Sequence, residues 1–441
     1  MQLNKFGLVR KTILIQVVFF LGLFRAVVFW PIRGANCPSD WLTPTGPCDF
    51  FSTNQELIFW LIPLSLMVLE LIWDRSLKGF VLASRSNWLV IAFFTLAAIS
   101  LVWSINIQIS TYKVIILISS SLLAIYIGYS YRLDDIIKNL SGFLLAVILF
   151  CFYTSIFHPG IGVMASSFYK GAWSGIFWHR NYLGCFMALA IAISLYQMPA
   201  SLKKRDRSIY FNILLLISAS YLLIRSKSAT GIITALILAV LVLILFAWEK
   251  WHHKLTRSHY YGIIGTITVI GLIVFTNLDF LFGLLGRNTS LTGRIPMWEY
   301  LFQHLISQRP WLGFGYGAIW HYQGLRNTLA LTLHWGSAVM IGDNGFIDII
   351  LHLGIIGLSV LVTLLIAGLI SAIKFLGQKR TLASAFPLIF LIFGMIANIS
   401  LSLILESETF VWIIAIAAIV AIRKEMQNQD SLILNKKLKL G

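Results

Sequence analysis

Residues Gly345–Ile373 read GFIDIILHLGIIGLSVLVTLLIAGLISAI, and this apolar run decides the fold. A helix needs roughly 20 apolar residues to cross the hydrocarbon core of a bilayer, and the run exceeds that length. About twelve runs of this kind follow one another along the chain. They are Ile13–Trp30, Leu57–Trp73, Trp88–Trp103, Tyr112–Tyr131, Gly142–Phe157, Tyr182–Met198, Tyr210–Ile224, Gly231–Trp248, Tyr261–Phe282, Gly345–Ile373, Leu382–Leu405 and Phe410–Ile422. The sequence therefore predicts an all-α polytopic membrane protein.

Composition and charge placement support the same conclusion. Of the 441 residues, 58% are hydrophobic and 12% charged, which excludes an ordinary soluble domain. The formal net charge of +17 would suit nucleic-acid binding, but the basic residues recur in every second loop, as the positive-inside rule requires. They are Lys5, Arg10, Lys11, Arg75, Lys78, Arg85, Arg132, Lys138, Lys203, Lys204, Arg205, Arg207, Lys250, Lys254, Arg257, Lys374, Lys379, Arg380, Arg423 and Lys424. We assign these loops and both termini to the cytoplasm and set nucleic acid aside.

The spans divide the chain into four parts. Residues 1–282 form an N-terminal transmembrane bundle of about nine helices. Residues 283–344 form an outward segment too long for a simple connection, so we expect a folded helical cap. Residues 345–422 return to the membrane, and residues 423–441 form a cytoplasmic tail. Within the cap, the glycines of the run 313–317 predict a flexible turn.

The cysteines give no metal site. Cys37 and Cys48 share an outward loop where a disulfide is an open alternative. Cys151 and Cys185 fall in or beside spans, where small packing residues are typical. No Cys/His cluster has the spacing of a metal site, so we expect neither metal nor cofactor.

The first unusual outward loop is HPGIGVMASSFYKGAWSGIFWHRN, residues 158–181. Its polar group His179, Arg180 and Asn181 comes directly before a span. The positive-inside bias argues against a purely topological role for an arginine on the outer side, so Arg180 is a candidate anion ligand. Its aromatic residues could stack on sugar rings or form an interfacial belt, and both alternatives stay open.

The second loop is a tight turn, Arg225 to Thr230, between two apolar spans. It places Arg225 and Lys227 within three residues at the outer interface. Arginine holds phosphate oxygens bidentately and lysine adds a point charge, so the turn predicts a phosphate site. Snorkelling of the two side chains from helix ends is the alternative.

The third group belongs to the cap. Arg294 stands at the start of an amphipathic helical pattern that includes Trp298. The cap ends with His334 and then Asp343-Asn344, directly before a span. A carboxylate in this place could also simply cap the next helix.

Taken together, these stretches resemble the superfamily of O-antigen ligases and exopolysaccharide polymerases. The resemblance covers roughly Ala172 to Leu358. It rests on GAWSGIFWHRNYLG (Gly171–Gly184), SKSATG (Ser226–Gly231), TGRIPMW (Thr292–Trp298), RPWLGFGYGAIW (Arg309–Trp320) and DNGFIDIILHLGIIGL (Asp343–Leu358). It implies a fold like that of GT-C-type glycosyltransferases, with a periplasmic cap over a cleft. It also implies a glycan donor on undecaprenyl pyrophosphate, and essential arginines near Arg225/Lys227 and at Arg294.

Two positions depart from the pattern of this superfamily. Lys227 stands where arginine is frequent, and Asp343 stands where the ligases commonly have histidine. The first motif resembles the exopolysaccharide polymerase branch more than the ligases. We therefore expect a surface polysaccharide polymerase in the bacterial inner membrane, with an O-antigen ligase as the alternative.

The expected chemistry gives each residue a role. Arg225, Lys227, Arg294 and Arg180 would stabilise the pyrophosphate leaving group without a metal. Asp343 is the first candidate for the general base and His334 the second. The residues expected to help bind the substrate are His179, Asn181, Asn344 and Trp298.

The expected partners are the bilayer and the lipid-linked oligosaccharide, with chain-length regulators or export proteins as further candidates. A lipid-linked glycan flippase or transporter is the rival of another class, and a non-catalytic assembly protein is a third. Transporters usually carry ionisable residues within the spans, whereas here these residues gather at the outer face.

Overall fold

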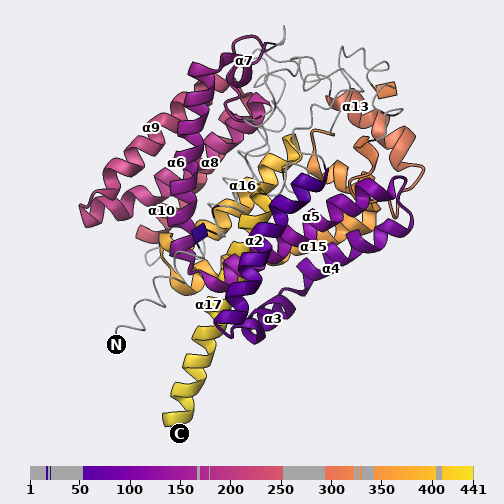
Figure 1. The fold of residues 1–441 in the computed structure, drawn as a ribbon. Coiled ribbons are helices and arrows are strands. Elements are labelled where there is room, and N and C mark those ends of the chain that lie inside the picture. The colour runs from indigo at the N-terminus through magenta and orange to yellow at the C-terminus, as the bar shows by residue number, and fades with distance from the viewer. Residues whose placement is uncertain are drawn as a thin grey trace.

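The computed structural model describes residues 16–17, 20, 53–165, 169–177, 179–251, 294–321, 325, 328–329, 342–403 and 410–440. Within these residues every regular element is helical, apart from an isolated bridge between Val163 and Trp173. The all-α prediction is confirmed (Figure 1). The predicted span Tyr261–Phe282, most of Ile13–Trp30, and both Cys37 and Cys48 lie outside the described residues.

Six of the described helices are long and apolar enough to cross a membrane. They are α5 (Ile107–Ser130), α6 (Leu133–Phe157), α8 (Arg180–Lys204), α9 (Ser208–Ser226), α10 (Ala229–Trp251) and α15 (Gly345–Lys379). The bent pair α3 (Leu77–Ser86) and α4 (Trp88–Ile99) gives a seventh if it is one span. The other longer helices are α2 (Thr53–Trp73), α16 (Phe386–Ser400) and α17 (Phe410–Leu440). The chain is therefore a multi-pass membrane protein, and the total of about twelve spans stays a prediction.

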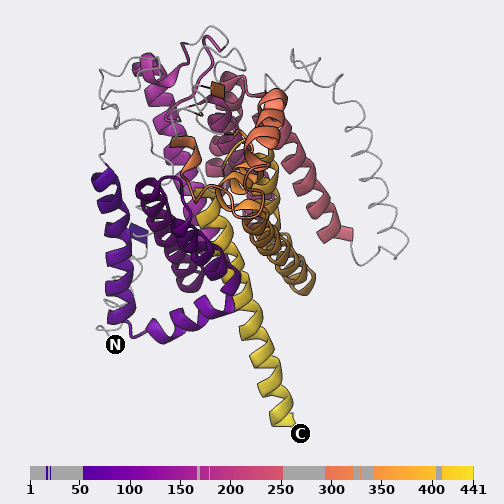
Figure 2. The same cartoon turned by 90° about the vertical axis from the view of Figure 1, so that its right-hand side faces the viewer.

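The helices form two groups with α16 and α17 between them (Figures 1 and 2). One group holds α6 and α8 to α10, and the other holds α2 to α5 and α15. The short helix α7 (Pro159–Gly162) and α13 (Arg294–Leu301) lie at one end of the bundle, opposite the C-terminus. At the C-terminal end, Arg423 donates to Asn87 Oδ1 at 2.9 Å, joining α17 to α4. Segments predicted to face the same side thus lie at the same end of the molecule.

Several boundaries differ from the predicted spans. Helix α17 continues without a break through the predicted tail to Leu440, and α6 begins at Leu133 instead of Gly142. Helix α13 passes directly into a π-helical turn, Phe302–Ile306. Hydropathy marks where a helix is apolar and not where its hydrogen-bonded backbone ends, so polar extensions of this kind escape it.

Helix α15 is broken at Gly354, whose backbone has φ +66° and ψ −166°. A β-carbon at this position would overlap the backbone of Trp311. The break leaves carbonyls of the first half of α15 without their helical partners. Phe314 N donates to Leu351 O at 2.8 Å and Gly315 N donates to His352 O at 3.0 Å. The segment 310–317 therefore replaces the missing helical hydrogen bonds.

The prediction of a flexible turn at 313–317 is wrong. The three glycines of this segment, Gly313, Gly315 and Gly317, all have positive φ. A β-carbon on Gly313 would overlap the backbone of His352, and one on Gly315 would overlap Ser104. On its other side the segment bonds the α4–α5 connection, where Ile105 N donates to Phe314 O at 3.0 Å. The glycines permit close backbone approach in a fixed conformation.

A second close approach joins α8 to α10. A β-carbon on Gly231 would lie 2.6 Å from the backbone of Gly184, and one on Gly184 would lie 2.6 Å from the side chain of Ser228 and 3.3 Å from Gly231 Cα. Small residues at a crossing let two membrane helices come into direct backbone contact. This contact brings the start of α10 against the start of α8, and so joins the first two motifs of the sequence.

Candidate functional site

The first cluster forms where α8 begins. His179 is the N-cap of α8, and its ring Nδ1 accepts from Asn181 N at 3.2 Å. The guanidinium of Arg180 donates to the carbonyl oxygen of Lys227 and stacks on the Tyr169 ring at 4.3 Å. Arg180 is buried. It therefore holds the two motifs together, a structural role that the anion-binding prediction did not include.

The serine-rich turn between α9 and α10 carries two cations, Arg225 and Lys227. Lys227 is the C-cap of α9 in the left-handed conformation, with φ +52°. Ser228 Oγ donates to Asn181 Oδ1 at 3.0 Å and accepts from Gly231 N at 3.1 Å. Asn181 thus positions the turn through its side-chain oxygen.

Arg225 and Lys227 are both exposed at this turn. The Arg225 guanidinium stacks 4.8 Å from the centre of the Trp173 ring, and its carbonyl accepts from Trp173 N at 2.9 Å. The Lys227 ammonium lies 3.4 Å from the carbonyl of Lys170. Two exposed cations within one turn of the chain favour the binding of an anion.

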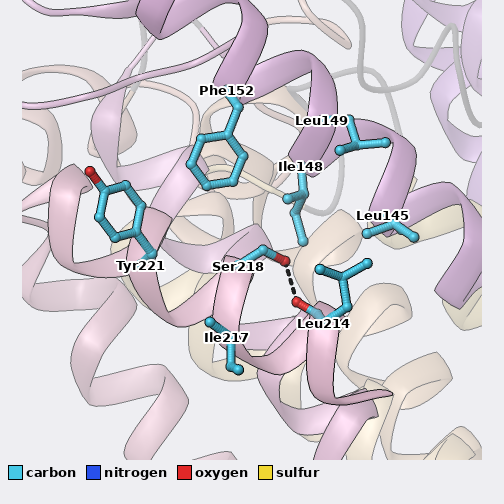
Figure 3. Close-up of a pocket in the computed structure, with 8 residues that line it drawn as sticks. All are labelled: Leu145, Ile148, Leu149, Phe152, Leu214, Ile217, Ser218 and Tyr221. Carbon is cyan, nitrogen blue, oxygen red and sulfur yellow. Dashed lines mark hydrogen bonds between the residues drawn. The ribbon is translucent and has the colours of Figure 1, made fainter. Parts of the chain in front are cut away.

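An apolar groove lies between α6 and α9 (Figure 3). It encloses about 410 Å³ and is lined by Leu145, Ile148, Leu149, Phe152, Leu214, Ile217, Ser218 and Tyr221. Ser218 Oγ, which lines the groove, donates to Leu214 O at 2.6 Å. The Trp173 ring centre lies 6.0 Å from that of Tyr221 and 6.2 Å from that of Phe152. The aromatic ring on which Arg225 stacks therefore contacts two residues that line the groove.

The second cluster joins the cap to α15. Arg294, the first residue of α13, places Nε 3.1 Å from Oδ2 of Asp343. One turn further along α13, Trp298 Nε1 donates to Gly342 O at 2.7 Å. The Arg294 side chain is 12% exposed and that of Asp343 is 29% exposed. The pair is therefore largely shielded from solvent, but a ligand can still reach both side chains.

Asn344, and not Asp343, caps α15. Its Oδ1 accepts from Phe346 N at 3.0 Å and from Ile347 N at 3.2 Å. Asp343 has φ +49°, a left-handed conformation, and its carboxylate points to Arg294 instead of the helix. The alternative in which Asp343 serves only as a helix cap is wrong, and the substrate-binding role expected for Asn344 stays a prediction beside its capping role.

Burial raises the pKa of the Asp343 carboxyl above its ordinary value, while the neighbouring Arg294 guanidinium acts in the opposite direction. A carboxylate with a raised pKa is a better proton acceptor near neutral pH.

The structure places nine of the ten predicted site residues, because His334 lies outside the described residues. Sequence reasoning missed two further ionisable residues, Asp348 and His352, which are both buried in the first half of α15. The signal was present, since an ionisable residue inside an apolar run is expensive and commonly functional. Among the described residues, no group of three His, Cys, Asp or Glu could hold a metal ion, and metal independence stays a prediction.

These features define a class of protein: an all-helical membrane protein with exposed cations and a shielded Arg–Asp pair. Residues 213–362 match the family model described as O-antigen ligase. The chain is also 26% identical, over 171 residues, to the exopolysaccharide production protein ExoQ of Rhizobium meliloti (strain 1021). The alignment covers 38% of this chain and 38% of that protein. Both comparisons support the resemblance of this chain to the O-antigen ligase and exopolysaccharide polymerase superfamily.

The matched segment holds most of the candidate site. It includes Arg225, Lys227, Arg294 and Asp343, whereas His179, Arg180 and Asn181 precede it. The first motif is nevertheless joined to the match through the hydrogen bonds of Arg180 and Ser228.

Proposed function

We propose that this protein is a membrane glycosyltransferase that polymerises glycan repeat units carried on undecaprenyl pyrophosphate. It acts at the periplasmic face of the bacterial inner membrane, with both termini in the cytoplasm. The observation that supports this most strongly is a pair of exposed cations, Arg225 and Lys227, of which Arg225 stacks on an aromatic ring that contacts the lining of an apolar groove. This combination suits a lipid with a strongly anionic head group.

The donor fits both parts of this arrangement. A polyprenyl chain would lie along α6 and α9, where the lining is aliphatic and aromatic. Its pyrophosphate would reach Arg225 bidentately and Lys227 as a point charge. Glycosyl transfer releases this pyrophosphate, so cations that stabilise the developing negative charge lower the barrier.

The Arg294–Asp343 pair supplies a further cation for the pyrophosphate and the general base for the acceptor hydroxyl. In the structure Arg294 Nε is engaged by the carboxylate of Asp343. A bound pyrophosphate competes for the guanidinium and leaves the carboxylate available to accept the proton of an attacking hydroxyl. Donor binding would thus activate the base, and the carboxylate's raised pKa assists this step.

Two other functions compete with polymerisation. An O-antigen ligase would use the same donor site but transfer the glycan to a different acceptor, and the description of the matched family favours it. A flippase or transporter would move the lipid-linked glycan without chemistry. Buried Asp348 and His352 in α15 give this alternative more support than the sequence did.

One reconstituted reaction separates the three. Purified protein in vesicles receives an undecaprenyl-pyrophosphate oligosaccharide, and the lipid-linked products are followed by gel and mass spectrometry. The proposal expects a ladder of longer lipid-linked chains without any added acceptor. Consumption of the donor only when a lipid-core acceptor is supplied would assign a ligase. Movement of intact donor across the bilayer, without new glycosidic bonds, would assign a transporter.

A further inference from the structure

A buried carboxylate lies directly behind the Arg294–Asp343 pair. Asp348, in the first turn of α15, is 1% exposed. Its Oδ1 accepts from Trp320 Nε1 at 2.9 Å and from Gly342 N at 3.1 Å, and its Oδ2 accepts from Ser402 Oγ. These donors come from the cap, from the connection before α15 and from the connection after α16.

Such a carboxylate is costly to bury unless it is well bonded. Here several donors and the N-terminal end of α15 offset the loss of water, because the helix macrodipole favours negative charge at that end. A β-carbon on Gly342 would lie 2.5 Å from Asp348 Oδ1, so glycine is needed for the close approach.

The bonds of Asp348 fix the backbone that carries Asp343. Gly342 N is held by Asp348 at 3.1 Å, and Gly342 O is held by Trp298 Nε1 at 2.7 Å. The next residue, Asp343, is in the left-handed conformation, which a residue other than glycine adopts less readily and which its surroundings must support. Trp298 lies one turn after Arg294 on α13. The two bonds to Gly342 therefore set where the carboxylate of Asp343 meets Arg294.

We propose that Asp348 is a positioning residue for the transfer reaction and acts through Asp343. It holds the Gly342–Asp343 peptide in the geometry that directs the Asp343 carboxylate toward the acceptor hydroxyl. This inference rests on the proposed function, in which Asp343 is the base.

A double-mutant cycle tests the inference. Asp348→Asn keeps the size of the side chain but removes the charge and one acceptor oxygen. We expect its turnover at saturating donor to fall about 100-fold with little change in KM, because a shift of about 1 Å at a reacting group has an effect of that size. In an Asp343→Asn background the same change should add almost nothing, since the group it positions is already absent. Multiplicative losses in the double variant, or an unchanged rate in Asp348→Asn alone, would overturn the proposal.

The test includes a matched control variant and a second variant of the Asp348 hydrogen bonds. Asp134→Asn removes an exposed carboxylate from the first turn of another spanning helix, α6, and should leave turnover unchanged. Should Asp348→Asn fail to fold, Trp320→Phe removes one donor to Asp348 without burying an altered charge. It should show a smaller loss of turnover that also disappears in the Asp343→Asn background, and a loss that persists there would contradict the proposal.

A readout independent of catalysis separates this proposal from the proposed function. The amide of Gly342 donates to Asp348, so it should exchange slowly with deuterated water. Faster exchange of the peptide that contains Gly342 in Asp348→Asn supports the positioning role even when the wild-type protein makes no polymer. Unchanged exchange contradicts the positioning role whatever the protein's activity.

Discussion

Arg294 Nε lies 3.1 Å from Asp343 Oδ2, and this contact joins the first residue of α13 to the residue that precedes the N-cap of α15. It connects the cap to the membrane bundle, and neither side chain is fully buried. Both residues were chosen as site candidates from the sequence, but nothing in the sequence showed that they contact each other.

Removing the charge of Asp343 should stop the reaction without unfolding the protein. Asp343→Asn keeps the shape of the side chain but cannot accept the acceptor's proton. We expect turnover to fall by about 10²–10⁴-fold, which is the usual contribution of a general base. Turnover is measured from the rate at which lipid-linked chains lengthen. Asp206→Asn, in the exposed connection before α9, is the matched control and should retain full activity. Near wild-type turnover in Asp343→Asn would transfer the role of base to another group.

The rate should also depend on pH in a defined direction. Asp343 works as a base only when deprotonated, and burial raises its pKa above the ordinary value of about 3.9. The kcat/KM for donor should therefore fall as the pH is lowered through this raised pKa, instead of holding constant down to pH 4. The residual activity of Asp343→Asn should lack this acid limb. An acid limb that persists in Asp343→Asn would belong to a different group.

Filling the α6–α9 groove should weaken donor binding. Ile217→Trp inserts a bulky side chain into the groove shown in Figure 3, so a polyprenyl chain would be displaced. We expect KM for the lipid-linked donor to rise about tenfold, equivalent to about 1.4 kcal/mol, with kcat little changed. Ile366→Trp, at an exposed position on α15, controls for a new tryptophan on the membrane surface. Equal KM values in the two variants would mean that the donor's chain lies elsewhere.

The break in α15 should tolerate no side chain. Gly354→Ala forces a β-carbon into the backbone of Trp311 at a φ of +66°, and such strain costs of order 1–3 kcal/mol before the overlap is counted. We expect a clear drop in thermal stability in detergent. Gly377→Ala, in the same helix but facing open space, should be neutral or stabilising by up to about 1 kcal/mol. Equal stability of the two variants would show that the segment 310–317 does not pack against the break in α15.

Sequence alone predicted the helical membrane class because long apolar runs recur along most of the chain. It could not predict the break at Gly354, since that conformation depends on hydrogen bonds from residues some 40 positions earlier in the chain. The glycines of 313–317 were predicted to form a flexible turn because their contacts with Ser104 and His352, which are distant in sequence, could not be foreseen.

The candidate site was predicted as separate pieces. Charge and position identified Arg225, Lys227, Arg294 and Asp343. The sequence did not predict that Arg180 and Asn181 bond the turn before α10, because these hydrogen bonds depend on the α8–α10 contact. Asp348 was overlooked because it falls inside the run that decided the fold, where one carboxylate among many apolar residues did not alter the hydropathy.

Arg294 and Asp343 form the proposed reaction centre for a lipid-linked donor. The most direct test of this claim compares wild type and Arg294→Ala at equal amounts of membrane-inserted protein, with an undecaprenyl-pyrophosphate oligosaccharide as the sole substrate. We predict a ladder of lengthened lipid-linked chains from wild type and none from Arg294→Ala. An equal ladder from Arg294→Ala would contradict the claim and remove this pair from the reaction centre.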